Sequence, residues 1–217
     1  MYYFTTILPG LTRNWTISWR NYKRIQRVTL LRFPWQQRVE SSRSRVKFVK
    51  LIVIGGAKSG KSQYCVKLLK EKYKSPCLVV TAEPKDPEME ERIKRHKENR
   101  PKEWLVIEEP VEIALCLKDI PKDRDVVLID CLTLWLSNML LSFDDEKLLK
   151  YVEDFVATVR DYPSDIILVS NEVGLGIVPD NPLARKFRDL SGMLNQRLVD
   201  ECDSAIFMIA GTPIRIK

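Results

Sequence analysis

The chain lacks several features that would place it in specialised protein classes. No run of about 18 apolar residues occurs, so the sequence predicts no membrane-spanning helix. The five cysteines are scattered and never spaced C-x-x-C, which argues against a disulfide scaffold or zinc knuckle and favours a reducing, cytoplasmic compartment. The 8 glycines and 12 prolines among 217 residues exclude collagen-like and low-complexity chains. What remains, 45% hydrophobic and 30% charged, suits a folded core.

Positive charge is concentrated near the start of the chain. Residues 1–47 hold 10 of the 36 basic residues and one of the 29 acidic residues, so they carry +9 while residues 48–217 carry −2. We therefore treat residues 1–47 as a basic extension and residues 48–217 as the functional domain. The extension has three interpretations. It binds nucleic acid or anionic lipid, it is a targeting peptide, or it is a non-native segment that precedes the true start of the protein at Val46. The net negative charge of residues 48–217 argues against nucleic acid as a partner.

Beyond residue 48, short apolar runs alternate with amphipathic stretches. This alternation predicts an α/β domain with a mainly parallel sheet flanked by helices. The runs expected as strands are 51–54, 77–80, 126–129, 166–169 and 205–209. The expected helices are 61–73, 87–97, 111–117, 132–141, 146–160 and 182–201. In the last helix, the residues expected to face the sheet are Leu183, Phe187, Leu190, Leu194 and Leu198. The residues expected on its polar face are Arg185, Arg188, Gly192 and Asn195.

A glycine-rich segment follows the first predicted strand and opens the first predicted helix. It fits G-x-x-x-x-G-K-[ST] without a mismatch and consists of Gly55, Gly56, Ala57, Lys58, Ser59, Gly60, Lys61 and Ser62. Such a loop turns backbone N–H groups toward phosphate oxygens, and the helix adds its positive N-terminal dipole. Lys61 is predicted to reach the β and γ phosphates, and the Ser62 hydroxyl to ligate Mg²⁺.

An acidic residue ends another predicted buried strand. Asp130 follows the apolar run 126–129. In a P-loop protein, a second residue for the magnesium site is expected at the end of such a strand. The alternative is that Asp130 caps the helix predicted at 132–141, and the two roles can coexist. Glu172, after the strand at 166–169, is the other candidate for a metal ligand or a base.

The only histidine, His96, lies in a charged segment with i,i+4 pairs such as Glu88 and Arg92. One interpretation is a surface histidine near a helix end. The other is a nucleophile, since neutral imidazole is available near pH 7. Neighbouring Arg95, Lys97 and Arg100 would neutralise phosphate charge.

The order of these segments resembles one family, the bifunctional adenosylcobinamide kinase / adenosylcobinamide-phosphate guanylyltransferase of cobalamin assembly. The resemblance covers about residues 48–217. Its matching segments are GGAKSGKS at 55–62, TAEP at 81–84, RIKRHKENRP at 92–101, EEP at 108–110, LIDCLTLWL at 128–136, VSNEVGLGIVPDN at 169–181 and PLARKFRDLSGMLNQR at 182–197.

This resemblance implies a RecA-like P-loop fold and two activities. One phosphorylates adenosylcobinamide with ATP or GTP; the other transfers GMP from GTP to adenosylcobinamide phosphate through a guanylylated His96. It also implies a homotrimer. Besides the glycine-rich segment, the implied nucleotide contacts are Thr81, Ala82, Lys97, Glu98, Asn99, Arg100, Glu108 and Asp130. Glu108 is expected to read the guanine base. Some family members carry Glu where this chain has Asp130.

Other functions fit parts of the pattern. A different small-molecule P-loop kinase would need no histidine, and a RecA-like nucleic-acid-binding module would use the basic extension. A guanylyltransferase without kinase activity has the same residues. An apolar loop that includes Leu175, Ile177, Val178 and Pro179 fits a corrinoid contact, ordinary loop packing or a subunit interface.

Overall fold

The computed structural model describes residues 49–84, 86–98, 101 and 103–217, without the side chains of residues 92 and 95–98. The predicted extension 1–47 lies outside this part, so the division of the chain stays a prediction. The elements in chain order are β1 (Lys50–Gly55), α1 (Lys61–Lys72), β2 (Pro76–Val80), α2 (Pro87–Glu98), β3 (Leu105–Glu108), α3 (Ile113–Asp119), β4 (Val126–Asp130), α4 (Leu132–Ser142), α5 (Asp145–Asp161), β5 (Asp165–Asn171), α6 (Pro182–Glu201), β6 (Ser204–Ile209) and β7 (Thr212–Arg215).

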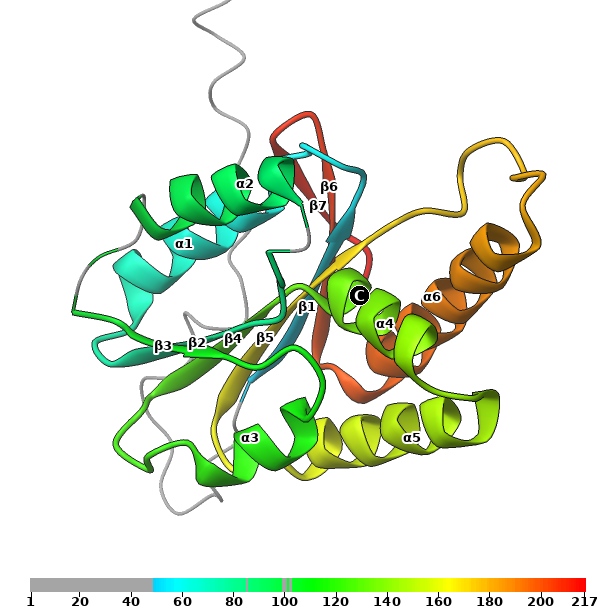
Figure 1. The fold of residues 1–217 in the computed structure, drawn as a ribbon. Coiled ribbons are helices and arrows are strands. Elements are labelled where there is room, and N and C mark those ends of the chain that lie inside the picture. Colours follow the sequence, from blue (N-terminus) through cyan, green and yellow to red (C-terminus); the bar gives the residue numbers. More distant parts are fainter. Residues whose placement is uncertain (1–48, 85, 99–100, 102) are drawn as a thin grey trace, which may run out of the picture. The chain divides into compact units, whose positions relative to one another are not determined.

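One sheet runs through the described part of the chain (Figure 1). Its strand order is β3-β2-β4-β5-β1-β6-β7, and every neighbouring pair is parallel except β6 with β7. The central strands are buried along nearly their whole length, which is why they appear in the sequence as continuous apolar runs. The predicted α/β class and its mainly parallel sheet are confirmed.

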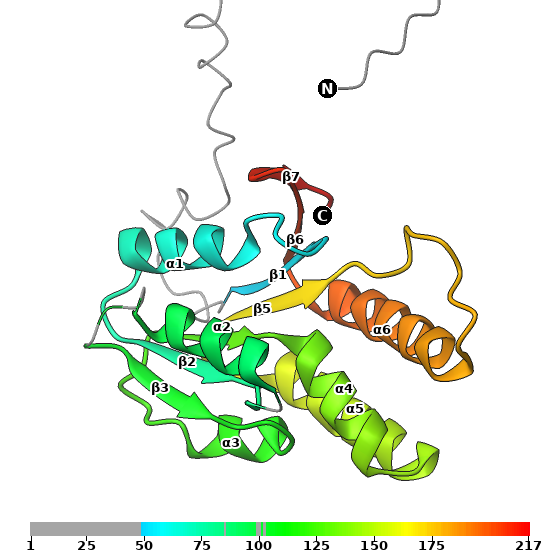
Figure 2. The same cartoon turned by 45° about the horizontal axis from the view of Figure 1, so that its top comes forward.

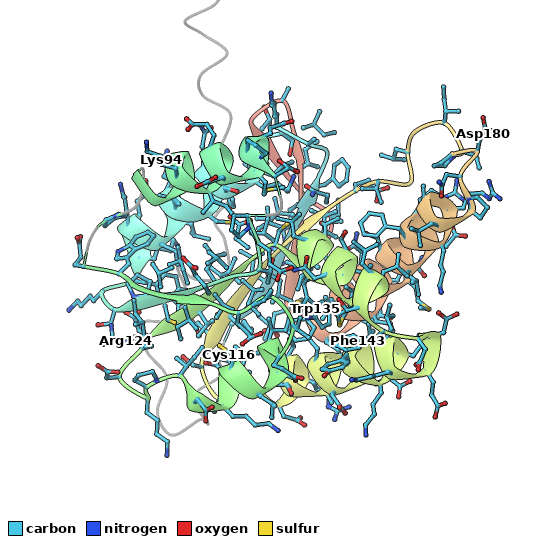
Figure 3. The ribbon with its side chains drawn as sticks, viewed as in Figure 1. Lys94, Cys116, Arg124, Trp135, Phe143 and Asp180 are labelled. Carbon is cyan, nitrogen blue, oxygen red and sulfur yellow. The ribbon has the colours of Figure 1, made fainter. Side chains whose placement is uncertain are left out.

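Helices cover both faces of this sheet. Figure 2 shows α1 on one side and α3 and α5 on the other, and α4, α5 and α6 pack against one another. The largest buried side chains of the core include Trp135 of α4 and Phe155 of α5, whose ring centroids lie 4.9 Å apart. Trp135 and Phe143 are marked in Figure 3. The apolar faces of the helices therefore close the core against the sheet.

The five predicted strands and six predicted helices are confirmed within a few residues of their ends. Two strands, β3 and β7, were not predicted. Strand β3 has only four residues and alternates half-buried with exposed positions, and β7 is exposed throughout and contains Pro213. Both are edge strands, where the sequence does not need a continuous apolar run.

The prediction for the faces of α6 needs two corrections. Leu183 does not face the sheet. It lies in the first turn of α6, which extends beyond the core, and it is 47% exposed. Asn195, expected on the polar face, is 6% exposed. Its Nδ2 donates a hydrogen bond to the Asn171 carbonyl at 3.2 Å, so a polar interaction at the end of β5 explains its burial. Leu194 and Leu198 are buried as predicted.

The register of the sheet places the carboxyl ends of β1, β2, β4, β5 and β6 next to one another. Gly55 pairs with Asn171 and Met208, while Asp130 pairs with Val80. All these strands are parallel, so their carboxyl ends meet at one edge of the sheet. The loops that leave this edge carry the residues singled out in the sequence.

No helix in the described part of the chain has the length and apolar character needed to cross a bilayer.

Candidate nucleotide site

The glycine-rich loop occupies the turn between β1 and α1. At Gly55 a Cβ atom would lie 2.5 Å from the Met208 carbonyl oxygen and 2.9 Å from Ser59 Oγ, so only glycine fits this strand end. Gly60, the N-cap of α1, has a φ of 96°, in the left-handed region that favours glycine. These two positions let the chain reverse tightly and start α1 beside the strand.

Lys61 turns back over this loop. Its side chain is buried, and Nζ donates hydrogen bonds to the carbonyl oxygens of Gly55 at 2.9 Å and Gly56 at 2.7 Å. The Ser59 hydroxyl is also buried and has no hydrogen-bond partner among the described residues. A cation and an unsatisfied hydroxyl at a helix N-terminus suit an anionic ligand.

Ser62 and Asp130 meet across the edge of the sheet. Ser62 Oγ donates a hydrogen bond to Asp130 Oδ2 at 3.0 Å. The N-cap of α4 is Cys131, so the alternative in which Asp130 caps that helix is wrong. Helix α4 starts at Leu132 as predicted, its cap is the residue just before it, and the Asp130 carboxylate instead faces the first turn of α1.

Thr81 ties the end of β2 to the end of β4. Its hydroxyl donates to the Cys131 carbonyl at 2.7 Å and accepts from the Cys131 N–H at 3.0 Å. The Thr81 carbonyl accepts from Asn138 Nδ2 at 2.9 Å, and the same amide donates to the Pro110 carbonyl at 3.2 Å. Thr81 is fully buried. Its hydroxyl therefore holds the segment that follows Asp130.

The end of β5 is held by three separate elements. The Asn171 N–H donates to Thr133 Oγ1 at 2.9 Å, and its carbonyl accepts from Asn195. The next residue, Glu172, donates its N–H to the Gly55 carbonyl at 3.1 Å. Helices α4 and α6 and the glycine-rich loop thus fix the point where Glu172 leaves the sheet.

A hairpin that the sequence reasoning missed supports the loop from the other side. Ala210 and Gly211, with φ values of 48° and 79°, join β6 to β7 in a two-residue turn. The Gly211 N–H donates to the Ser59 carbonyl at 2.9 Å. The Ala-Gly pair after an apolar run was the available signal. Thr133, Asn138 and Asn195 were missed as well, because nothing local distinguishes a buried polar helix residue.

Two of the remaining predicted contacts, Ala82 and Glu108, lie at the carboxyl ends of β2 and β3. Ala82 is half-buried directly after Thr81, and Glu108 is exposed at the end of β3, in register with Val80. His96, Lys97 and Glu98 lie in the last turn of α2, but their side chains are outside the described residues. Asn99 and Arg100 lie outside them entirely. Their predicted roles stay predictions.

The cysteines near the site are not poised as nucleophiles. Burial is the main cause that raises the pKa of the Cys65 thiol, and the nearby Asp130 carboxylate raises it further. Burial and Asp130 also raise the pKa of Cys131. Both thiols therefore stay protonated near neutral pH.

The oxygen donors present suit a magnesium ion that shares its coordination with a nucleotide. A hydroxyl and a carboxylate oxygen converge at Ser62 and Asp130. Among the described residues, no group of three or more His, Cys, Asp or Glu side chains could hold a metal ion by itself. Mg²⁺ commonly takes one or two protein ligands and completes its shell with phosphates and waters.

Fold and site together define a P-loop nucleotide-binding protein. A family model described as cobinamide kinase / cobinamide phosphate guanyltransferase matches residues 51–216. The chain belongs to this family.

Curated relatives are named as bifunctional adenosylcobalamin biosynthesis proteins. The chain is 39% identical over 166 residues to the bifunctional adenosylcobalamin biosynthesis protein CobP of Pseudomonas aeruginosa, covering 76% of this chain and 96% of that protein. It is 33% identical to the bifunctional adenosylcobalamin biosynthesis protein CobU of Salmonella typhimurium and 29% identical to that of Escherichia coli. Each of these two matches covers 77% of this chain and 99% of the relative. Among solved structures, the RadB recombinase matches with a TM-score of 0.42 and 16% identity, covering 73% of each chain.

Proposed function

We propose that this chain phosphorylates adenosylcobinamide with ATP or GTP and then transfers GMP from GTP to adenosylcobinamide phosphate. Membership of the cobinamide kinase / cobinamide phosphate guanyltransferase family supports both activities. The structural observation that carries the proposal is the hydrogen bond between Ser62 and Asp130, next to the Lys61 ammonium that lies over the glycine-rich loop. Phosphoryl transfer depends mainly on positioning and charge neutralisation, which these residues supply.

In the kinase step, the acceptor hydroxyl oxygen bonds to the γ-phosphorus of the nucleotide. The bond from that phosphorus to the β,γ-bridging oxygen breaks, and the nucleoside diphosphate leaves. Lys61 neutralises the β and γ phosphates after exchanging its two carbonyl partners for phosphate oxygens. We assign Glu172, fixed beside Gly55, as the carboxylate that receives the hydroxyl proton.

Magnesium is the expected cofactor, because Ser62 and Asp130 offer hard oxygen donors next to the phosphate cradle. When bound, the ion would neutralise charge on the phosphates. Ser62 and Asp130 are the residues that would hold it.

In the nucleotidyl step, an imidazole nitrogen of His96 attacks the α-phosphorus of GTP and pyrophosphate leaves. A phosphate oxygen of adenosylcobinamide phosphate then attacks the same phosphorus, and the nitrogen–phosphorus bond breaks. Adenosyl-GDP-cobinamide results. Lys97 and Arg100 are proposed to offset phosphate charge, with Glu98 and Asn99 as further contacts. Glu108 would accept hydrogen bonds from guanine N1–H and N2–H.

A homotrimer in the cytoplasm completes the proposal. Scattered cysteines without C-x-x-C spacing support a reducing compartment. The trimer rests on the family resemblance alone, and mass measurement in solution by light scattering tests it.

The decisive experiment uses GTP labelled at the α or the γ phosphorus, with and without adenosylcobinamide. We expect γ-label on the acceptor, and α-label covalently on the protein when no acceptor is present. His96→Ala should lose the covalent α-label, whereas Lys94→Ala, an exposed change on the same helix, should keep it.

Each alternative has its own result. Transfer of γ-label to the acceptor with no covalent α-label in the wild type would indicate an ordinary small-molecule kinase. Covalent α-label without phosphoryl transfer would indicate a guanylyltransferase alone. No transfer of either label would reject the proposed function. Covalent label that persists in His96→Ala would place the nucleophile elsewhere.

A further inference from the structure

The loop between β5 and α6 exposes a cluster of large apolar side chains. Ile177 is 97% exposed, Leu175 83% and Val178 57%. Val173 at the start of the loop and Leu183 in the first turn of α6 are also exposed. Single exposed apolar residues are common, but several in one short segment mark a binding surface. We call residues 173–181 the apolar loop.

The apolar loop is anchored at both ends. At its start, Glu172 donates its N–H to Gly55 and accepts at Oε1 from the Gly174 N–H. At its end, Asn181 Oδ1 accepts from the N–H groups that begin α6. Arg185 Nη1 donates to the carbonyls of Pro179 at 2.8 Å and Asp180 at 2.6 Å. The backbone is thus organised while the apolar side chains between the anchors remain exposed.

The position of the loop relates it to the phosphate site. It begins one residue after Glu172, which is hydrogen-bonded to the strand end that opens the glycine-rich loop. From there it runs outward beyond the edge of the sheet, and Figure 3 shows Asp180 at its outer end. A ligand that reaches the phosphate site from this side would lie along the apolar loop.

We infer that the apolar loop binds the corrinoid body of the acceptor; this inference rests on the proposed function. An acceptor in the kinase step must bring its hydroxyl to the γ-phosphate, and the rest of the molecule must extend outward from there. Cobinamide is a broad macrocycle with apolar ring faces and amide side chains. Leu175 and Ile177 offer an apolar contact for such a face.

The same surface could instead pair with a second copy of the chain. The loop starts at the reaction centre, so a corrinoid explains both its place and its exposure, whereas a subunit contact explains only the exposure. The experiment must therefore record acceptor binding and oligomeric mass on the same samples.

The test compares Leu175→Ser and Ile177→Ser with the control Leu115→Ser. Leu115 is 54% exposed on α3, which lies far from the loop in Figures 1 and 2. The loop variants should each raise the KM for adenosylcobinamide by about tenfold. An apolar side chain that becomes buried when the acceptor binds contributes at least that much to affinity. The KM for ATP, covalent labelling by GTP alone and the mass in solution should stay unchanged. Leu115→Ser should match the wild type.

Other results decide against the inference. An unchanged KM for adenosylcobinamide in both loop variants would overturn it, as would a fall in mass that accompanies the loss of activity. Equilibrium dialysis with adenosylcobinamide alone adds a second reading, in which the loop variants should bind more weakly. Failure of the proposed function looks different, because the wild type would then phosphorylate no adenosylcobinamide. In that case the dialysis still decides: equal binding by wild type and variants overturns the inference.

Discussion

Ser62 Oγ donates a hydrogen bond to Asp130 Oδ2 at 3.0 Å, joining residues 68 positions apart in the chain. The contact links the first turn of α1 to the carboxyl end of β4, although β5 separates β4 from β1 in the sheet. Each residue alone is an ordinary serine or aspartate. Together they form the oxygen pair that we propose for magnesium.

Asp130→Asn should weaken the response to magnesium. The amide keeps the size of the side chain but loses the charge that attracts a divalent ion, so the half-activating Mg²⁺ concentration should rise about tenfold or more. Binding of a fluorescent nucleotide in EDTA should change less than about twofold. Asp154→Asn, at an exposed position on α5, is the matched control. An unchanged magnesium response would remove Asp130 from the metal site.

Lys61→Met should weaken nucleotide binding. The change keeps most of the unbranched side chain but removes the ammonium that contacts the Gly55 and Gly56 carbonyls. Hydrogen bonds to charged groups contribute about 1.5–3 kcal/mol, so the Kd for ATP should rise roughly tenfold to a hundredfold. Isothermal titration calorimetry measures this directly. Lys67→Met, on the exposed side of the same helix, should bind like the wild type, and equal affinity of both variants would contradict the prediction.

Comparing Thr81→Val with Thr81→Ser should distinguish the contribution of the Thr81 hydroxyl from that of its methyl group. Valine cannot bond to the Cys131 N–H and carbonyl, whereas serine can. We expect Thr81→Val to raise the half-activating Mg²⁺ concentration by about fivefold or more, because Cys131, the residue next to Asp130, is then no longer held in place. Thr81→Ser should keep the half-activating concentration close to that of the wild type. In an Asp130→Asn background the valine change should add little further effect. Equal Mg²⁺ responses in the two Thr81 variants would show that the hydroxyl has no such role.

The five cysteines should react slowly in the folded protein. Burial raises the pKa of Cys77 and Cys202 to about 12 and that of Cys116 to about 11. A raised thiol pKa lowers the thiolate fraction at any pH below it, and burial limits access of the reagent, so at pH 8 these thiols should react at least several-fold more slowly than an ordinary exposed thiol. Ellman's reagent measures the rates. Five thiols should react quickly in guanidinium chloride, and fast reaction in native buffer would contradict the assigned burial.

Phe155→Ala should destabilise the fold strongly without touching the site. The side chain is fully buried on α5 and packs against Trp135. Its removal leaves a cavity in the core, so the free energy of unfolding should fall by about 3–5 kcal/mol. Urea denaturation followed by circular dichroism provides the value. Phe155→Leu should lose less, and a loss below about 1 kcal/mol for the alanine variant would contradict this packing.

Local signals were enough to predict the five inner strands, the helices and the glycine-rich loop. Buried parallel strands need continuous apolar runs, and a phosphate cradle needs glycines, a lysine and a hydroxyl at close spacing. The edge strands β3 and β7 gave no such signal, because an edge strand can be short, exposed or interrupted by proline. The prediction of which residues lie on each face of α6 was partly wrong. Periodicity does not reveal that Asn195 is buried, where it donates a hydrogen bond to the end of β5.

By itself, the sequence determined the α/β class, the nucleotide cradle and the family resemblance, because these depend on residues close together along the chain. Only the tertiary structure decided that Asp130 faces Ser62 rather than capping α4, that Thr81 and Asn138 hold the neighbouring strand ends, and that the Gly211 turn supports the loop. These contacts join segments far apart in sequence. Their geometry follows from strand order and register, which no local pattern encodes.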